Sequence, residues 1–108
     1  MKQTLVRYKT KLAKSQDNQQ LIEGVFEELK AKSPQDVRYL ALRLADGTFV
    51  HFVIRDTGDS ASPLNKLEAF QAFQSGLKER CIELPQAEDA TIVGNYRMLD
   101  TQSGRRDP

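Results

Sequence analysis

Residues 37–56 constrain the fold of this 108-residue chain more than any other segment. Two runs rich in β-branched, aromatic and aliphatic residues, 37–44 and 48–55, predict two strands. Asp46 and Gly47 lie between them and are typical of a tight hairpin turn. The hairpin separates two helical segments, so it determines the order in which strands and helices follow one another.

The segments on either side of the hairpin complete the order strand, helix, strand, strand, helix, strand. Residues 4–10 alternate as a first strand and residues 90–99 as a last one. Apolar residues at helical spacing predict helices over 17–32 and 66–82. This order predicts a ferredoxin-like βαββαβ fold of the α+β class, in which four antiparallel strands carry both helices on one face.

Three further residues are expected to mark the bounds of the second helix. Asn65 and Glu68 have the spacing of a capping box at its start. Pro85 is expected to end the helical region, since proline lacks the amide hydrogen that a helix needs.

A chain of this length predicts one domain, which we expect to span residues 1–99, followed by a flexible polar tail at 100–108. The net charge of +1 argues against a protein that binds nucleic acid mainly through phosphate contacts. The first residues lack the apolar run of a signal peptide or membrane span, so no membrane association is expected. The single cysteine, Cys81, favours a reducing, cytoplasmic location.

The length of the hairpin loop decides which side chains share a face of the sheet. A two-residue turn would pair Leu44 with Phe49, whereas a three-residue loop with a left-handed Gly47 would pair Arg43 with Phe49. The three-residue loop is preferred because it segregates the two kinds of side chain. One face then carries Leu40, Leu42, Leu44, Val50, Phe52 and Ile54, and the other carries Tyr39, Ala41, Arg43, Phe49, His51, Val53 and Arg55.

We expect the purer apolar face to meet the helices, because burying it gains most. The mixed face, to which we also assign Leu5, Arg7, Val93, Asn95 and Arg97, would then lie opposite the helices. It is too apolar to be fully solvated and too polar for a dry core. A second copy packed there by two-fold symmetry, leaving a partly polar cavity, would satisfy both conditions, so a homodimer is expected.

The chain resembles the small dimeric α+β barrel proteins, and within them the antibiotic-biosynthesis-monooxygenase-like family. The resemblance covers about residues 4–98. It is carried by Gly47-Thr48-Phe49-Val50-His51, Pro63-Leu64, Leu67-Glu68-Ala69-Phe70-Gln71-Ala72-Phe73, Glu79-Arg80-Cys81 and Val93-Gly94-Asn95-Tyr96-Arg97.

The resemblance implies several kinds of activity. The family includes cofactor-independent oxygenases that act on aromatic or quinone-like compounds, heme-degrading enzymes, and proteins with no known reaction. The heme-degrading branch uses an asparagine, a tryptophan and a histidine on a helix. This chain has no tryptophan, and His51 lies in a predicted strand. We therefore expect no cofactor, and either a small oxygenase-like enzyme for an aromatic or carbonyl compound or a non-catalytic ligand-binding or structural module.

His51 leads the candidate catalytic residues, because only histidine has an ordinary pKa near neutrality. Tyr39 and Arg97 are predicted to orient a ligand beside it. Arg7, Phe49 and Asn95 are the predicted ligand-binding residues. The alternative is that His51 is an interface histidine whose ring is satisfied by a neighbouring polar group.

Three other kinds of site are disfavoured. One histidine and one cysteine cannot supply a typical zinc site, so no metal is expected. Cys81 is expected to be buried and inert. RNA-recognition modules share the βαββαβ order, but Asp46 stands where their third-strand motif begins with a basic residue.

Overall fold

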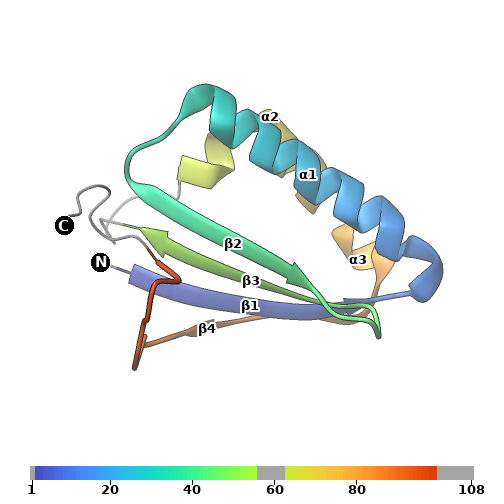
Figure 1. Cartoon of the computed structure of the whole chain (residues 1–108). Helices are drawn as coiled ribbons and strands as arrows, with labels where there is room; N and C mark the ends of the chain where they lie inside the picture. Colours follow the sequence, from blue (N-terminus) through green and yellow to red (C-terminus); the bar gives the residue numbers. More distant parts are fainter. Residues whose placement is uncertain (1, 56–62, 100–108) are drawn as a thin grey trace.

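The computed structural model describes residues 2–55 and 63–99 (Figure 1). Its strands are β1 (Lys2–Thr10), β2 (Val37–Arg43), β3 (Thr48–Arg55) and β4 (Cys81–Asp89). Its helices are α1 (Ser15–Lys32), α2 (Glu68–Gln74) and α3 (Leu77–Arg80), with short 3₁₀ turns η1 (Leu12–Lys14) and η2 (Pro63–Lys66). Residues 56–62 and the predicted tail at 100–108 lie outside the described residues.

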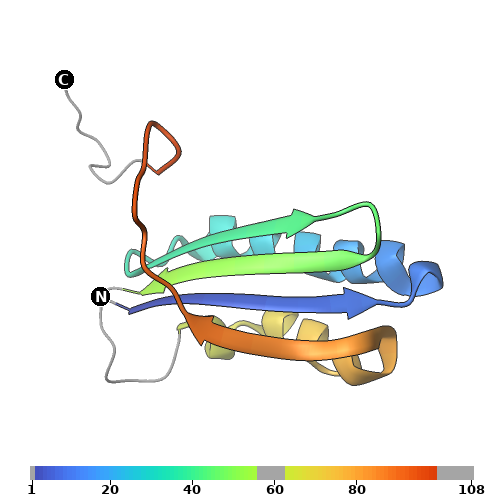
Figure 2. The same ribbon diagram turned by 90° about the horizontal axis from the view of Figure 1, so that it is seen from below.

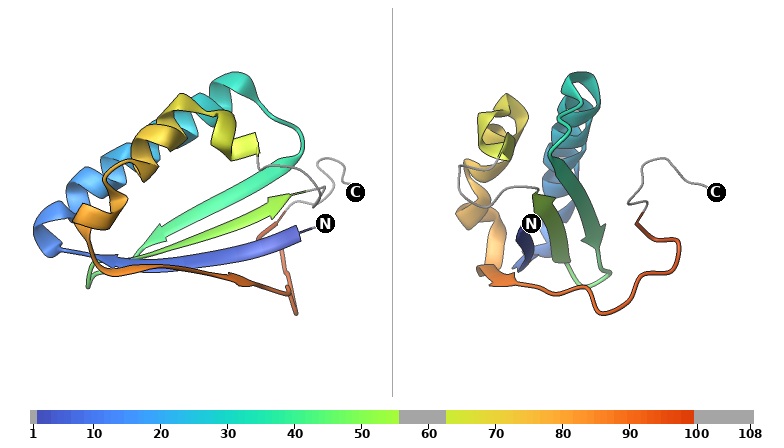
Figure 3. Two further views of the ribbon diagram at one scale, coloured as in Figure 1. Left: turned by 180° about the vertical axis from the view of Figure 1, so that it is seen from behind. Right: turned by 90° about the vertical axis from the view of Figure 1, so that its left-hand side faces the viewer.

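The four strands form one antiparallel sheet in the order β2-β3-β1-β4. All three α-helices lie on one side of this sheet, and its other side carries no helix in the described part of the chain (Figures 1 and 3). The predicted ferredoxin-like α+β fold is therefore confirmed. We call the helix-covered side of the sheet its inner face and the opposite side its outer face.

The hairpin has the predicted three-residue register. Arg43 pairs with Phe49, and Ala41 pairs with His51. Gly47 has a φ of 91°, the left-handed conformation that the loop requires. The carbonyl oxygen of Gly47 also accepts hydrogen bonds from the amide and the side chain of Thr10, so the loop is tied to the end of β1.

Replacing Gly47 with alanine should destabilise the fold more than the same change at Gly76. Both glycines have positive φ, 91° and 83°, so each alanine should cost about 1–2 kcal/mol in backbone strain. A Cβ at Gly47 would also lie 2.9 Å from the Thr10 carbonyl oxygen, whereas at Gly76 the nearest atom lies 3.5 Å away. Urea unfolding of the two variants measures the difference. Equal losses would show that the contact with Thr10 does not matter.

The last strand was predicted wrongly. β4 is Cys81–Asp89, and residues 90–99 form no strand. Pro85 does not end a helix but lies inside β4, where the pairing with β1 shifts register between Arg7 and Lys9. Proline is tolerated there because β4 is an edge strand and needs no amide hydrogen bond at the irregularity.

Residues 90–99 instead leave the end of β4 and cross the outer face (Figure 2). Seen from that side, the segment passes the ends of the other three strands and continues beyond β2. Val93, Tyr96 and Met98 are exposed along it. The segment therefore covers only one end of the outer face.

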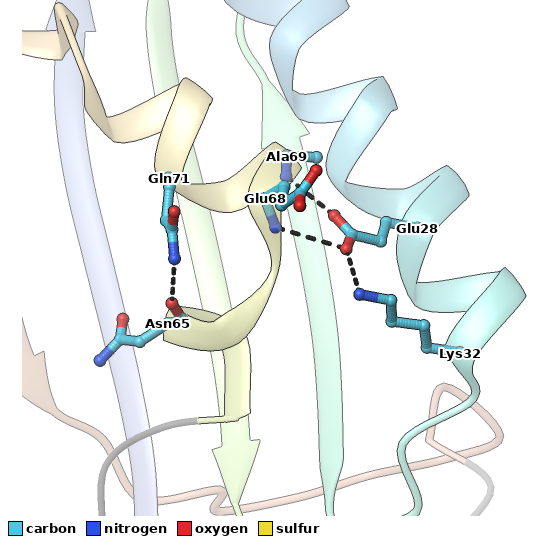
Figure 4. A network of polar contacts seen from close by, with 6 residues as sticks. All are labelled: Glu28, Lys32, Asn65, Glu68, Ala69 and Gln71. Atoms are coloured by element: carbon cyan, nitrogen blue, oxygen red, sulfur yellow. Dashed lines mark hydrogen bonds and ion pairs between the residues drawn. The ribbon is translucent and has the colours of Figure 1, made fainter.

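The second helical region is also interrupted. The predicted helix over 66–82 is divided into η2, α2 and α3, with Gly76 left-handed before α3. The Asn65 and Glu68 side chains do not cap α2, whose N-cap residue is Leu67. Glu28 of α1 accepts hydrogen bonds from the backbone amides of Glu68 and Ala69 instead (Figure 4). Lys32 forms an ion pair with the same carboxylate.

The structure reverses the predicted assignment of the two sheet faces, because the mixed face and not the purer apolar face meets the helices. Tyr39, Ala41, Phe49, His51 and Val53 point toward the helices and pack with the buried core. The face carrying Leu40, Leu42 and Leu44 points away from them. These three leucines are substantially exposed, Leu42 by 51%, whereas Ile54 on the same face is buried. Leu5 and Arg7 also belong to the outer face, because they pair with Phe52 and Val50 rather than with His51.

The core between the sheet and the helices is strongly aromatic. Tyr8 and Phe49 stack with their ring centroids 5.6 Å apart. The rest of the buried cluster consists of Ile22, Val25, Leu64, Leu67, Phe73 and Cys81. None of the described helices is both long and apolar enough to cross a membrane.

Candidate functional site

His51 lies at the centre of a hydrogen-bonded triad on the inner face. Its Nε2 atom lies 2.8 Å from the Tyr8 hydroxyl, and its Nδ1 atom lies 2.5 Å from the Tyr39 hydroxyl. The strand register brings the three side chains together, because His51 pairs with Val6 on one side and Ala41 on the other. Tyr8 and Tyr39 are therefore its diagonal neighbours, within reach of long side chains.

Two further residues continue this network into the helices. The side-chain amide of Asn18, on α1, donates to the Tyr8 hydroxyl at 2.9 Å. The Nε of Arg80, at the end of α3, donates to Asn18 Oδ1 at 2.9 Å. Arg80 also donates to the carbonyl oxygens of Phe73 and Ser75. Five elements thus contribute to one buried polar chain, which runs Arg80, Asn18, Tyr8, His51, Tyr39.

Burial keeps His51 and the two tyrosines of the triad neutral. His51 is only 4% exposed, and burial lowers its pKa to about 4. Burial also raises the pKa of both tyrosine hydroxyls well above their usual range. At neutral pH the triad therefore consists of an uncharged imidazole between two protonated phenols.

A cavity of about 170 Å³ opens beside the triad, between the inner face and the helices. We call it the inner cavity. Tyr8, Tyr39 and His51 supply its polar groups from the sheet, and Gln74 is the polar residue on the helix side. The remaining lining residues are Val6, Val53, Leu64, Phe70, Phe73, Leu77 and Pro85. A few convergent polar groups in an apolar enclosure are typical of small-molecule sites.

The structure brings together two of the three residues predicted as catalytic. His51 and Tyr39 share a hydrogen bond beside the inner cavity. Arg97 lies in the segment after β4, where its guanidinium stacks over the ring of exposed Tyr96 at 5.2 Å. It contributes nothing to the triad.

None of the three predicted ligand-binding residues lines the inner cavity. Phe49 is 1% exposed and packed against Tyr8 in the core. Arg7 points to the outer face beside β4, next to Glu83 and Gln86. Asn95 binds its own loop: its Oδ1 accepts from the amides of Met98 and Leu99, and its Nδ2 donates to the Leu99 carbonyl.

A larger cavity of about 470 Å³ lies on the outer face, and we call it the outer cavity. Leu40, Phe52 and Ile54 form its floor, and Ile92 and Met98 belong to the segment that crosses the sheet. We consider the inner cavity the better site despite its smaller volume. Its polar groups converge from three strands and are joined by hydrogen bonds. The polar residues that line the outer cavity are Arg38, Tyr39 and Asn95. The Tyr39 hydroxyl meets His51 instead, and both side-chain polar atoms of Asn95 bind its own loop.

Three members of the site, Tyr8, Asn18 and Arg80, were not identifiable from sequence patterns. Tyr8 lies 43 positions from His51 in the sequence, so no local pattern links the two. Asn18 and Arg80 look like ordinary polar positions on helices, and no local pattern distinguishes them from solvated ones. Pairing of β1 with β3 was the one signal that could have placed Tyr8 beside His51.

Metal and thiol chemistry find no support among the described residues. No group of three or more histidine, cysteine or acidic side chains there could hold a metal ion. Cys81 is buried in the core cluster, and burial raises the pKa of its thiol. The thiol therefore stays protonated, as expected of an inert cysteine.

No protein-family model and no curated protein matches this sequence. Solved structures do match the fold. A candidate antibiotic biosynthesis monooxygenase from Bacteroides thetaiotaomicron aligns with a TM-score of 0.74 at 11% identity, covering 92% of this chain and 95% of that one. A candidate member from Nitrosomonas europaea aligns with a TM-score of 0.69 at 15% identity, covering 84% and 88%.

A third match is a variant of SnoaB, a cofactor-independent oxygenase from Streptomyces nogalater. It aligns with a TM-score of 0.62 at 14% identity, covering 88% of this chain and 95% of that one. At these identities the likeness concerns the fold and not the reaction. The fold is that of the antibiotic-biosynthesis-monooxygenase-like proteins that the sequence resembles.

Proposed function

We propose that this protein binds a single-ring aromatic or quinone-like compound in the inner cavity. The observation that carries the proposal is the Tyr8–His51–Tyr39 triad at the wall of a 170 Å³ apolar enclosure. A cavity of roughly 150 Å³ is known to hold benzene, so the volume of the inner cavity suits a compound with one ring. Phe70 and Phe73 offer aromatic surface to such a ring.

We further propose that the reaction is a cofactor-independent oxygenation, as in the fold neighbour SnoaB. An electron-rich phenol would take one oxygen atom of O₂ and become a quinone, and the other oxygen would leave as water with two hydrogens from the ring compound. The Tyr39 hydroxyl would then hydrogen-bond the oxygen on which charge develops. The low pKa of His51 makes it a poor general base but a good hydrogen-bonding partner for Tyr39.

Removing the Tyr39 hydroxyl should abolish most of the function while leaving the fold intact. We expect Tyr39→Phe to lower oxygen uptake with a panel of single-ring phenols by about 10- to 100-fold, because a hydrogen bond to developing charge is lost. An oxygen electrode measures the rate. Tyr96→Phe is the matched control, since Tyr96 is 80% exposed and remote from the triad. Equal rates in wild type and both variants would contradict the proposal.

A non-catalytic binding module is the second candidate. The observation that favours it is that both nitrogens of His51 are already hydrogen-bonded to tyrosines. Such a module would be stabilised by ring compounds in a thermal-shift assay without consuming oxygen, because a ligand that binds the folded state raises its stability. Binding without oxygen uptake would therefore decide for this alternative.

We also propose that the protein is a homodimer formed through the outer face. This face exposes Leu40, Leu42 and Leu44 at the β2 edge of the sheet. At the opposite edge, Ile82 and Leu84 of β4 are exposed and alternate with buried Cys81. An apolar surface of this kind on a single chain is typical of an interface. A dimer matches the small dimeric α+β barrel proteins that the sequence resembles. The single buried Cys81 supports the further proposal of a reducing, cytoplasmic location.

A charge on the outer face should break this dimer. Leu42→Arg is expected to convert a species with twice the mass of one chain into a monomer, because an unpaired charge in an apolar interface is costly. Sedimentation equilibrium measures the mass. Leu12→Arg provides the control, since Leu12 is equally apolar and 71% exposed but lies in η1, away from the outer face. A wild-type monomer, or a Leu42→Arg dimer, would contradict the proposal.

A further inference from the structure

In the buried polar network from Arg80 to Tyr39, each hydrogen bond can be assigned a donor and an acceptor. Arginine is only a donor, so the Asn18 atom that meets its Nε must be the amide oxygen. The Asn18 NH₂ group therefore points at Tyr8, whose oxygen accepts this hydrogen bond. Arg80 itself is held by the carbonyl oxygens of Phe73 and Ser75, which prevents it from turning away.

The donor and acceptor roles at Tyr8 determine those at His51 and Tyr39. Since the Tyr8 oxygen already accepts from Asn18, its single hydroxyl hydrogen is free for His51 Nε2, which lies 2.8 Å away. A neutral imidazole that accepts at Nε2 carries its hydrogen on Nδ1. Nδ1 then donates to the Tyr39 oxygen. The Tyr39 hydroxyl hydrogen then has no acceptor among the described residues, and Tyr39 lines the inner cavity.

We propose that Arg80 and Asn18 are positioning residues that hold His51 as the Nδ1–H tautomer and so make Tyr39 a hydrogen-bond donor to the ligand. This inference rests on the proposed inner-cavity site and adds a rule of specificity to it. The ligand must present an acceptor, such as a carbonyl or quinone oxygen, where it meets Tyr39. A ring that lacks an acceptor there leaves the Tyr39 hydroxyl without a partner.

Asn18→Asp should reverse the three hydrogen bonds that link residue 18, Tyr8, His51 and Tyr39, without changing the shape of the network. A carboxylate has no hydrogen to give, so Tyr8 would have to donate its own hydrogen to Asp, which stays ionised beside Arg80. His51 would then donate from Nε2 to Tyr8 and accept at Nδ1 from Tyr39. The Tyr39 hydrogen would no longer reach the ligand.

The tautomer of His51 can be measured directly in the protein without ligand. Protonated and unprotonated ring nitrogens have widely separated ¹⁵N chemical shifts, and His51 is the only histidine in the chain. We expect the Nδ1–H tautomer in wild type and in Asn65→Asp, which adds the same charge at an exposed site, and the Nε2–H tautomer in Asn18→Asp. An Nε2–H tautomer in wild type would overturn the inference, and so would a tautomer that Asn18→Asp leaves unchanged.

A pair of probe ligands tests the rule of specificity. Acetophenone carries a carbonyl oxygen, and α-methylstyrene has the same shape with a CH₂ group in its place. Wild type should bind acetophenone about tenfold more tightly, and Asn18→Asp should lose this preference. Equal affinities in wild type would overturn the rule. A third outcome is that neither probe binds although Asn18→Asp changes the His51 tautomer as expected. That result would contradict the proposed function and support the assigned order of donors and acceptors.

If Asn18→Asp does not fold, the wild-type tautomer and the wild-type ratio of affinities each still decide the inference. Tyr8→Phe adds a second variant, since it removes the donor to Nε2 and leaves the rest of the ring in place. In Tyr8→Phe, His51 should no longer prefer the Nδ1–H tautomer, and the tenfold ratio of affinities for acetophenone and α-methylstyrene should be lost. A preserved Nδ1–H tautomer in Tyr8→Phe would show that Tyr8 does not set these donor and acceptor roles.

Discussion

Lowering the pH from 7 to 4.5 should cost the wild-type protein about 2 kcal/mol of stability through His51 alone. Burial lowers the pKa of this histidine from 6.5 to about 4 in the folded protein. Below pH 6.5 the unfolded chain therefore binds a proton that the folded protein does not accept. The contribution is fully present above pH 6.5 and is lost as the pH falls toward 4.

The comparison with His51→Gln isolates this effect from the titration of carboxylates. Glutamine keeps a side chain that can hydrogen-bond but does not titrate. Urea unfolding at pH 7, 5.5 and 4.5 should show a steeper loss in wild type than in His51→Gln. Parallel curves would mean that His51 is more solvated than its 4% exposure indicates, and the neutral triad would have to be abandoned.

Replacing Phe49 with alanine should destabilise the protein by about 3–5 kcal/mol, the largest effect that we expect from any single core substitution. Phe49 is 1% exposed, and its ring stacks on Tyr8 with an interplanar angle of 9°. Removing it would leave a void under the triad. Urea unfolding at neutral pH gives the value, and Tyr96→Ala, an exposed aromatic deletion, should change stability by less than about 0.5 kcal/mol.

The same variant decides between two roles for Phe49. The sequence suggested that it binds ligand, whereas the structure places it in the core, away from the inner cavity. A Phe49→Ala protein of unchanged stability that has lost ligand binding would restore the first role. A large loss of stability, with binding retained in whatever fraction is folded, would support the second.

The order of elements was predictable because it depends on local patterns. Helical spacing of apolar residues and the Gly47 loop are short-range features, and both the fold class and the Arg43–Phe49 register were confirmed. The last strand was not predictable in the same way. Residues 90–99 alternate more regularly than Cys81–Asp89, but pairing with β1 decides which segment joins the sheet.

The reversal of the sheet faces has a physical reason. Hydrophobicity indicates that the face with Leu40 and Leu42 must be covered. It does not indicate whether the helices or a second copy of the chain covers it. The helices instead cover the face with His51 and Tyr39, whose polar atoms satisfy one another and the distant Tyr8. Because these polar atoms hydrogen-bond one another, the side chains can be buried at little cost. Alternation within one strand does not show such partners.

The candidate site was half predictable for a related reason. His51 and Tyr39 were selected by chemistry and by a shared face of one hairpin, and they do lie together. Arg97 and Asn95 were placed beside them only because residues 90–99 were taken for a strand. Arg80 joins the site from the end of a four-residue helix, a position that depends on the packing of the whole chain.

Methyl-detected NMR titration with acetophenone tests most directly the claim that the inner cavity is the ligand site. The methyl groups of Val53, Leu64 and Leu77 line this cavity, and those of Leu40, Ile92 and Met98 line the outer one. We predict chemical-shift changes and ligand contacts at Val53, Leu64 and Leu77, with the other three unmoved. Contacts confined to Leu40, Ile92 and Met98 would place the ligand on the outer face and contradict the claim.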